Sequence, residues 1–561
     1  MDFKQKAADL IVAQTNLPAD QVFGLIERPK NAKMGDYAFP CFVLAKQFKK
    51  NPAAIAGEIA ESISDEAFAK IVAVGPYVNF TIDHNLLIAQ TLQAVLKQGQ
   101  HYGDQELGKG NVPIDMSSPN IAKPMSMGHL RSTVIGNSIA KIFEKVGYTP
   151  VKINYLGDYG TQFGKLITAY KKWGNEADVK RDPIHYLFQY YVKFHQEAED
   201  HPELEDEGRA WFKKLEDGDQ EAVELWQWFR EVSLKEFKRI YQELGVEFDS
   251  YNGEAFYNDK MDAVVEELKD KNLLVESRGA QVVELGQDEN PAMILKSDGT
   301  SIYLTRDLAA AEWRMKEYNF VKMLYVVGNE QTEHFKQLKA VLKKMGYDWS
   351  DDIYHVPFGL ITQNGKKLST RKGNVVFLDQ VLKDAVKLAR AQIDAKNPSL
   401  ANKDEVAHDV GVGAVIFHDL KNDRLDNFDF DLEEVVRFEG DTGPYVQYTN
   451  ARAQSVLRKA KALGKEASLA DINLDDEWAF QTAKDLADFP RIIARAEEKF
   501  EPSVVAKYSL ALAKKFNKYY ANVKILTDDE QLPARLALVE AVSTVLTEAL
   551  RLLGVNAPKE M

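Results

Sequence analysis

Residues 112–133, VPIDMSSPNIAKPMSMGHLRST, carry the clearest signal of the fold of this chain. A short apolar run opens this stretch, small and polar residues follow, and a helical pattern begins whose apolar residues, Val134 and Phe143 among them, fall on one face. Gly147 is expected to end this helix, and a second strand follows in PVKINYLGDYG from Pro150. Strand, helix and strand in this order predict the opening unit of a doubly wound parallel sheet.

The loop between the expected strand and helix suits phosphate groups. A helix start offers unpaired backbone N–H groups and the positive end of the helix dipole to an anion. Gly128 permits close approach of a ligand, and His129 can donate a hydrogen bond to a phosphate. A glycine and a histidine at a helix start also occur as an ordinary cap, so these two residues by themselves leave both interpretations open.

The whole stretch resembles the HIGH signature of class I aminoacyl-tRNA synthetases, in the SSPNIAKP and HLRST form typical of the arginine enzymes. Ser126, Met127, Gly128 and His129 occupy the four signature positions, with serine where the family usually has histidine. Serine keeps a donor at this position but lacks the imidazole. The resemblance implies that three residues of this first signature are catalytic and contact ATP: Ser126, Gly128 and His129.

A second segment, GKKLSTRKGN at residues 365–374, is similar to the KMSKS signature of the same class. Its five matching positions, Lys367–Arg371, form the second signature, in which Thr370 stands where the class has its catalytic lysine. The resemblance implies catalytic roles for Lys367, Ser369 and Arg371, and ATP contacts for Lys366 and Lys367.

Lys123, in the loop before the first signature, is the residue that the resemblance puts in place of the missing lysine. A solvated loop charge is the alternative interpretation of Lys123. The other candidate cations are Lys366, Lys367 and Arg371.

Three acidic residues lie beside the signature-like segments, and a guanidinium group requires carboxylate acceptors. Asp115 ends the first expected strand, Glu254 lies in EFDSYNGEAFY, and Asp307 lies in IYLTRDLAA. Tyr303 precedes Asp307 by one turn if that segment is helical. A surface or capping role is the alternative for any one of these acids taken alone. The resemblance implies that the arginine pocket is formed by Asp115, Asn120, Glu254, Tyr303, Asp307 and Gln331.

Two further runs resemble family segments near the same pocket. His334, in EQTEHF, is placed near ATP by resemblance, with a plain polar role at a helix start as the alternative. In NYLGDYGTQFG, Asp158 and Gln162 are candidates to line the pocket, and a turn-stabilising role stays open for Asp158.

The composition is that of a folded protein with several domains. A chain of 561 residues with 45% hydrophobic and 28% charged residues is expected to form about three to five domains. An amphipathic start and the lack of any apolar run of about 18 residues predict a cytoplasmic protein with no membrane contact. The one cysteine, Cys41, excludes an intrachain disulfide and a cysteine zinc cluster, and a net charge of −14 argues against indiscriminate binding to nucleic acid.

Four regions are expected along the chain. In residues 1–105 we expect an appended α+β domain with a strand at 71–82, and in the remainder strands again at SIYLTRD, KMLYVVG and IYHVPFGLI. The predicted fold class is α/β: a class I synthetase Rossmann-type parallel sheet with a helical insertion, an N-terminal α+β appended domain and a C-terminal all-α anticodon-binding bundle. The regions are 1–105, which by resemblance contacts the tRNA elbow; 106–380, the Rossmann-type catalytic domain with a helical insertion at about 175–300; 381–435, a connecting helical stem; and 436–561, a DALR-type anticodon-binding bundle.

The C-terminal region is the better candidate for RNA contact. Residues 441–561 contain 17 basic and 17 acidic residues, so this region is neutral while the rest of the chain carries the excess of acid. In KKFNKYY, at 514–520, aromatic residues beside lysines suit unstacked bases and phosphates. Phe516 is expected to pack in the core, whereas both roles stay open for Tyr520. Resemblance to the DALR domain, with Glu548 in place of its aspartate, implies tRNA contacts for Tyr445, Lys518 and Tyr520.

The resemblance as a whole implies ATP-dependent ligation of L-arginine to tRNA(Arg) through an arginyl-adenylate, with a first step that itself requires bound tRNA. Mg²⁺ would accompany ATP, zinc would be absent, and the enzyme would be a monomer whose partners are tRNA(Arg), arginine and ATP. Two alternatives remain: a class I synthetase or related nucleotidyltransferase for another amino acid, such as cysteine or glutamate, and a catalytically inactive homologue that only binds RNA.

Overall fold

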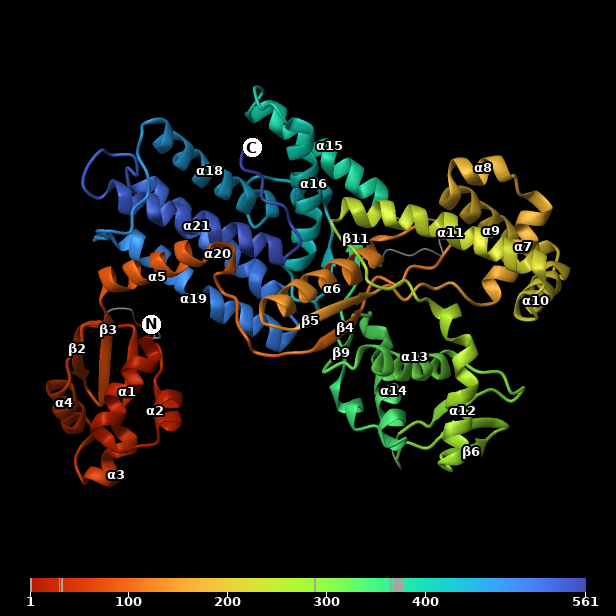
Figure 1. Ribbon diagram of the computed structural model, residues 1–561, viewed down its shortest axis with the longest axis horizontal. Helices are drawn as coiled ribbons and strands as arrows, with labels where there is room; N and C mark the ends of the chain where they lie inside the picture. Colours follow the sequence, from red (N-terminus) through yellow and green to blue (C-terminus); the bar gives the residue numbers. More distant parts are fainter. Residues whose placement is uncertain (1–2, 30, 32–33, 287–288, 364–365, 368–376) are drawn as a thin grey trace. The chain divides into compact units, whose positions relative to one another are not determined.

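The computed structural model describes residues 3–29, 31, 34–286, 289–363, 366–367 and 377–561. These residues form two compact units (Figure 1). The first unit comprises Met1–Tyr102, Arg452–Phe489 and Ala511–Leu546, and the second comprises Gly103–Ala451, Pro490–Leu510 and Thr547–Met561. Within the described ranges, no helix is long and apolar enough to cross a membrane.

The N-terminal part of the first unit is an antiparallel sheet covered by helices. The sheet has the order β1-β3-β2, with β1 at Tyr37–Pro40, β2 at Phe68–Val74 and β3 at Tyr77–Ile82. The prediction of one strand over 71–82 is wrong, because Gly75, at φ 57°, turns the chain and lets Val74 pair with Tyr77. The helices are α1 (Phe3–Thr15), α2 (Ala19–Leu25), α3 (Ala45–Phe48), α4 (Pro52–Ser62) and α5 (His84–Gln98).

The second unit contains the parallel sheet that the sequence predicts. Its strand order is β10-β9-β4-β5, and every neighbouring pair is parallel. Asp115, the last residue of β4, stands opposite Ile153 of β5 and Tyr325 of β9. The carboxyl ends of the four strands therefore lie at one edge, where ligands bind in open α/β sheets. The strands are β4 (Asn111–Asp115), β5 (Thr149–Ile153), β9 (Met323–Tyr325) and β10 (Ile353–His355).

Helix α6 (Met127–Lys145) connects β4 to β5 and is buried along almost its whole length. Gly136 lets it approach the end of β4 closely, since a Cβ there would lie 2.4 Å from the sulfur of Met116. Gly147, at φ 100°, follows the helix as predicted and returns the chain to β5. The first signature thus begins α6, directly beside the carboxyl end of β4.

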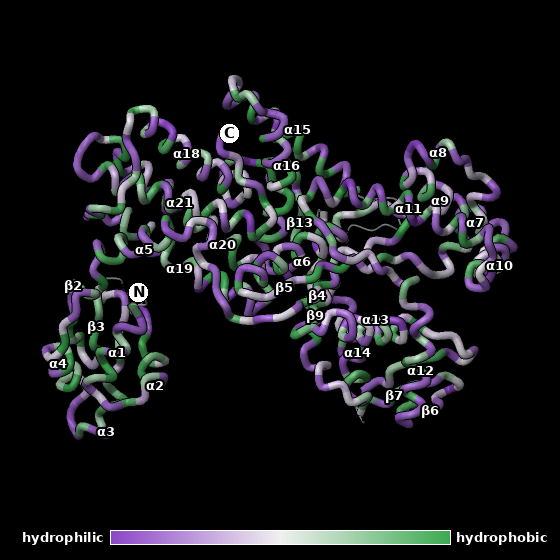
Figure 2. The backbone as a smooth tube through the Cα atoms, in the orientation of Figure 1, coloured by the Kyte–Doolittle hydropathy of each residue, from purple (hydrophilic) through white to green (hydrophobic). Residues whose placement is uncertain are grey.

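The insertion is helical only in its first part. Figure 2 shows hydrophilic and hydrophobic segments alternating along its helices, as expected where one face of each helix is buried. Its second part contains a small antiparallel sheet in the order β6-β7-β8, which the prediction of a helical insertion at about 175–300 did not include. The elements are α7 (Thr161–Trp173), α8 (Glu176–Arg181), α9 (Pro183–Asp200), α10 (Glu203–Glu216), α11 (Gln220–Glu243), α12 (Met261–Asp270), β6 (Leu274–Ser277), β7 (Ala280–Val283) and β8 (Ala292–Leu295).

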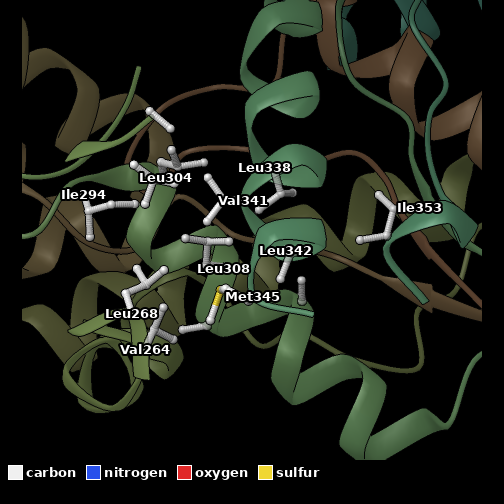
Figure 3. Packing of buried hydrophobic residues seen from close by; sticks show 14 of the residues in the cluster. Val264, Leu268, Ile294, Leu304, Leu308, Leu338, Val341, Leu342, Met345 and Ile353 are labelled. Atoms are coloured by element: carbon white, nitrogen blue, oxygen red, sulfur yellow. The ribbon is translucent and has the colours of Figure 1, made fainter. Parts of the chain in front are cut away.

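Residues 301–307 do not form the predicted strand, because α13 (Tyr303–Tyr318) begins there. Leu304 and Leu308 are buried one helical turn apart and face α14 (Thr332–Lys344), which contributes Leu338 and Val341 to the same core (Figure 3). This packing stabilises the helical conformation over the strand preference of the segment. It also fixes the starts of α13 and α14, where several predicted site residues lie.

The remaining chain is mainly helical, as predicted. Helices α15 and α16 pack against each other through buried aliphatic residues, among them Ile393 and Val410. Short strands pair nearby: β11 is antiparallel to β12 and parallel to β13. The elements are β11 (Ile361–Gln363), β12 (Lys366–Lys367), α15 (Leu378–Lys396), α16 (Lys403–Leu420), β13 (Phe428–Asp429), α17 (Leu432–Val435), α18 (Gly443–Ala462), α19 (Glu477–Lys499), α20 (Ser503–Asn522) and α21 (Leu532–Leu552).

Candidate active site

The loop between β4 and α6 is held in an unusual backbone conformation by buried hydroxyl groups. Ser117, Ser118 and Ala122 all have positive φ angles, which residues with a Cβ rarely adopt. The backbone N–H of Ser117 donates to Oγ of Ser132 (2.8 Å), and the hydroxyl of Thr133 donates to Oγ of Ser117 (2.8 Å). The serine and threonine of HLRST therefore stabilise the loop that precedes the first signature.

His129 is a neutral donor at the start of α6. The backbone N–H of Ser126 donates to Nδ1 of His129 at 3.0 Å, so the ring proton of the neutral imidazole lies on Nε2. Burial lowers the pKa of His129 to about 4. The imidazole therefore stays neutral at neutral pH and can donate through Nε2 to an anionic ligand.

Two glycines leave room at this edge of the sheet. Gly128 is exposed, and the nearest protein atom to a Cβ built on it is Oγ of Ser126 at 3.6 Å, so its open side faces away from the protein core. Gly157, after β5, lies against Asn120, whose Oδ1 would be 2.2 Å from a Cβ at that position. The absence of a side chain at Gly157 thus allows Asn120 to lie beside this turn.

Lys123 lies beside the insertion. Its Nζ is 4.6 Å from the ring centroid of Tyr191 on α9, so a cation–π contact helps to orient this half-buried lysine. This contact restrains the lysine beside the first signature.

Asp307 is the best-positioned acceptor among the three predicted acids. It lies in the first part of α13, one turn after Tyr303, as expected for a helical segment. The hydroxyl of Tyr155 donates to its Oδ1 (3.0 Å), and Nε2 of His334 lies 2.6 Å from its Oδ2. The ring of Tyr303 is 5.1 Å from that of His334 and is 62% exposed. Contacts to both carboxylate oxygens thus hold the side chain of Asp307 in place, and the exposed ring of Tyr303 lies one helical turn away.

Glu254 is a second acceptor in the same neighbourhood. Its carboxylate is 3.5 Å from the guanidinium of Arg306, and burial raises its pKa to about 7 although Arg306 opposes the shift. Its position is fixed through the backbone, because its N–H donates to the carbonyl of Leu156 (3.0 Å). Asp158 instead accepts from the backbone N–H of Ala255 (2.9 Å) and from Nε of Arg230 (2.8 Å), so it joins the turn after β5 to residues distant in the sequence.

Asp115 is the most deeply buried of the three acids, and it lies closer to its protein guanidinium than Glu254 does to Arg306. Nη2 of Arg314 lies 2.8 Å from its Oδ2, with side-chain exposures of 1% and 3% for the arginine and the aspartate. Burial raises the pKa of Asp115, while Arg314 lowers it. Asp115 is therefore half of a buried ion pair.

The remaining predicted residues, Gln331 and those of the second segment, are described by the structure only in part. Gln331 is exposed just before α14, close in sequence to His334. The backbones of Lys366 and Lys367 pair with β11. Ser369 and Arg371 lie outside the described residues.

On α20, the RNA candidates divide by exposure. Phe516 and Tyr519 are fully buried, whereas Tyr520 is 41% exposed and Lys518 is exposed. The core prediction for Phe516 is confirmed. Tyr445 is half-buried near the start of α18, in the other unit.

Sequence reasoning missed the residues that support the pocket. Arg306, Arg314 and Tyr155 contact the predicted acids, and Ser132 and Tyr241 hold the loop before the first signature. Arg306, Tyr155 and Ser132 lie inside runs that resemble family segments, whereas nothing in the local sequence distinguished Arg314 and Tyr241. In the part of the chain that the structure describes, no group of three or more His, Cys, Asp or Glu side chains is arranged to hold a metal ion.

Three family models match this chain. Residues 91–432 match the model described as "tRNA synthetases class I (R), catalytic domain", residues 446–561 the "DALR anticodon binding domain", and residues 2–82 the "Arginyl tRNA synthetase N terminal domain". The catalytic model covers more than half of the sequence and includes the parallel sheet, both signatures and the acids described above.

Curated relatives and solved structures agree with these models. The chain is 78% identical to the arginine–tRNA ligase of Lactobacillus acidophilus, over 100% of both chains, and 62% identical to that of Enterococcus faecalis, over 98% of both. The arginyl-tRNA synthetase of Thermus thermophilus superposes with a TM-score of 0.81 at 27% identity over 99% of both chains. The chain therefore belongs to the arginyl-tRNA synthetase family of class I aminoacyl-tRNA synthetases.

Proposed function

We propose that this chain, an arginine–tRNA ligase, works through the pocket at the carboxyl edge of its parallel sheet. A carboxylate oxygen of arginine attacks the α-phosphorus of ATP, the bond to the bridging oxygen breaks, and pyrophosphate leaves. A ribose hydroxyl of the terminal adenosine of tRNA(Arg) then attacks the carbonyl carbon of the arginyl-adenylate, and AMP leaves. No protein nucleophile is required, so catalysis rests on positioning and on charge stabilisation.

The arrangement around Asp307 is the observation that supports this proposal. Tyr155 and His334 hold both oxygens of its carboxylate, and Tyr303 stands one helical turn away with its ring exposed. A carboxylate fixed in this way accepts paired N–H groups of a planar guanidinium, which a neutral side chain of similar shape does not supply. Glu254 provides a second acceptor, and Asn120 and Gln331 would bind the α-amino and carboxylate ends of the substrate.

The phosphate groups of ATP would lie at the start of α6. Ser126 and His129 offer neutral donors there, and Gly128 leaves its outer side open. Neutral donors alone do not balance a triphosphate, so cations must come from elsewhere. We assign this part to Lys123, with Lys366, Lys367, Ser369 and Arg371 of the second segment and with Mg²⁺ bound to ATP. By resemblance His334 would also contact ATP, while its Nε2 lies 2.6 Å from Oδ2 of Asp307.

Regions outside the parallel sheet would bind and recognise the tRNA. Tyr445, Lys518 and Tyr520 would contact the anticodon arm, and the region 1–105 would contact the elbow. The division into 106–380 for catalysis, 381–435 for the stem and 436–561 for the bundle belongs to the same proposal. A cytoplasmic monomer is the state that we infer for the active enzyme, and sedimentation at micromolar concentration checks it.

Pyrophosphate exchange measured with each amino acid, in the presence and absence of tRNA(Arg), tests the proposal. Exchange is expected with arginine alone among the amino acids, and only when tRNA is bound. Exchange driven by cysteine or glutamate would contradict the arginine pocket. A lack of exchange under every condition would favour a protein that only binds RNA.

A further inference from the structure

The arginine pocket contains a guanidinium of its own. Arg314, on α13, is completely buried, and its Nη2 lies 2.8 Å from Oδ2 of Asp115. The rings of Tyr155, Tyr257 and Tyr325 surround it, with centroids 5.3, 5.9 and 5.5 Å from its central carbon. A carboxylate and aromatic rings are the groups that a substrate guanidinium also needs.

Tyr155 links this internal guanidinium to the proposed substrate site. Its ring lies against Arg314, while its hydroxyl donates to Oδ1 of Asp307 at 3.0 Å. Arg314 and Asp307 belong to the same helix, two turns apart on one side. A change in the charge of Arg314 therefore alters the electrostatic potential at Asp307. The side chain of Tyr155 links the two groups, and the buried surroundings screen the interaction weakly.

Counting the charges around Tyr155 shows what Arg314 contributes. Three acids lie here, Asp115, Glu254 and Asp307. Two arginines oppose them, since Arg306 pairs with Glu254 and Arg314 pairs with Asp115. The three acids exceed the two arginines by one, and the negative charge left over corresponds to the single positive charge of an arginine side chain.

We propose that Arg314 is a positioning residue that determines specificity: by neutralising Asp115, it limits the pocket to the one uncompensated carboxylate that a single substrate guanidinium matches. This inference rests on the proposed function, in which Asp307 binds the substrate. Asp115 then acts through Arg314 and does not touch arginine. Burial works against the charge of Arg314, yet Asp115 and the three tyrosines raise its pKa well above the ordinary value, so the guanidinium stays charged.

The test is a double-mutant cycle on the pair. In D115N, the charge of Arg314 is unbalanced and repels a cationic substrate, so the KM for arginine should rise about 30-fold while the KM for ATP stays within threefold. Citrulline, the neutral isostere of arginine, reports on shape alone, and its inhibition constant should change less than threefold. Damage to the structure would weaken both ligands together.

The second mutation provides the decisive result. R314M in the D115N background removes the unbalanced charge, so the KM for arginine should return to within about threefold of the wild-type value. Replacement of a buried ion pair by neutral groups of similar size is often tolerated. R314Q/D115N serves as a second neutral pair, with thermal melting as the check of folding. A folded double variant whose arginine KM stays 30-fold above wild type would overturn the proposal, because Asp115 would then bind the substrate itself. Failure of both doubles to fold would also count against it, since the pair would then serve folding alone.

The chain offers a matched control in a second buried pair of the same unit. Nε of Arg131 lies 3.3 Å from Oδ2 of Asp419, with side-chain exposures of 1% and 2%. D419N and R131M/D419N should leave the ratio of citrulline to arginine binding unchanged, whatever they do to the overall rate. D307N, measured in parallel, separates the two proposals: an unchanged arginine KM in D307N would refute the proposed pocket, whereas the rescue in the Asp115 background tests Arg314 alone.

Discussion

The proposed arginine pocket and the exposed face of α20 differ in how far their charged groups and aromatic rings are buried. In the pocket, Asp307 is bonded on both oxygens and its side chain is only 17% exposed. On α20, Lys518 is exposed, and Tyr520 is 41% exposed with its ring 5.1 Å from the guanidinium carbon of Arg452. Charged groups and aromatic rings therefore lie in largely buried surroundings around Asp307, whereas on α20 they are exposed to water.

This difference predicts the size and the salt dependence of each contribution. A charge removed from a buried, bonded position costs several kcal/mol, whereas an exposed charge typically contributes less than about 1 kcal/mol. Salt at physiological strength screens exposed charges over about 8 Å and affects buried pairs much less. Substitutions in the pocket should therefore act strongly and independently of salt, and substitutions on α20 should act weakly and depend on salt.

Asp307→Asn should have the largest effect. Loss of the charged acceptor is expected to raise the KM for arginine about 200-fold, roughly 3 kcal/mol, with the KM for ATP within threefold. Steady-state aminoacylation at low and high salt measures both values. D351N is the control, because that carboxylate pairs with Lys343 on the surface. An effect that disappears at high salt would show that the pocket is not shielded from water.

Lys123→Ala should have the next largest effect, on rate and not on arginine binding. If Lys123 replaces the cation missing at Thr370, its removal should slow formation of arginyl-adenylate about 100-fold in a single turnover. K193A is the matched control, since that lysine also lies over an aromatic ring, 4.7 Å from the centroid of Trp173. An unchanged single-turnover rate in K123A would refute the assignment.

Glu254 should make arginine binding depend on pH by about tenfold. Because burial raises its pKa to about 7, the carboxylate is mostly protonated at pH 6 and mostly ionised at pH 8. Only the ionised form attracts the substrate cation, so the KM for arginine should fall as the pH rises through 7. E254Q should show no such fall. The same profile in E254Q and wild type would assign the dependence to another group.

Much of the fold could be predicted because its central elements carry local signals. The apolar run ending at Asp115, the one-sided pattern of α6 and the glycine after it predict strand, helix and turn without tertiary information. The failures occurred where packing overrode local preference. Residues 301–307 are rich in residues that favour strands, but Leu304 and Leu308 bury one face of a helix against α14. Strands β6 to β8 are four residues each, too short to show a clear period.

Only the site residues that lie inside recognisable motifs could be predicted from the sequence. Ser126 and His129 stand inside a signature, and their mutual hydrogen bond follows from helix geometry. Arg314 has no such context, because its partner Asp115 is far away in the sequence and the sheet brings the two together. Neighbours in sequence also mislead: Arg306 adjoins Asp307, yet its carboxylate partner is Glu254. Pairing of buried charges is a tertiary property that a single sequence does not display.

The smallest effects are expected on α20, because its candidate RNA-contacting side chains are exposed to water. Y520A should raise the KM for tRNA about fivefold, near the lower limit for a base stacked on an aromatic ring, and leave the KM for arginine unchanged. K518A should weaken tRNA binding only a few-fold and reduce the salt slope by about one phosphate contact. F516A supplies the contrast, because this buried ring packs in the core and its loss should cost about 3 to 5 kcal/mol of folding stability. Filter binding across a salt series, together with melting curves, separates these outcomes. A salt slope unchanged in K518A, or a tRNA KM unchanged in Y520A, would remove this face of α20 from the RNA interface and leave its exposed charge as ordinary surface.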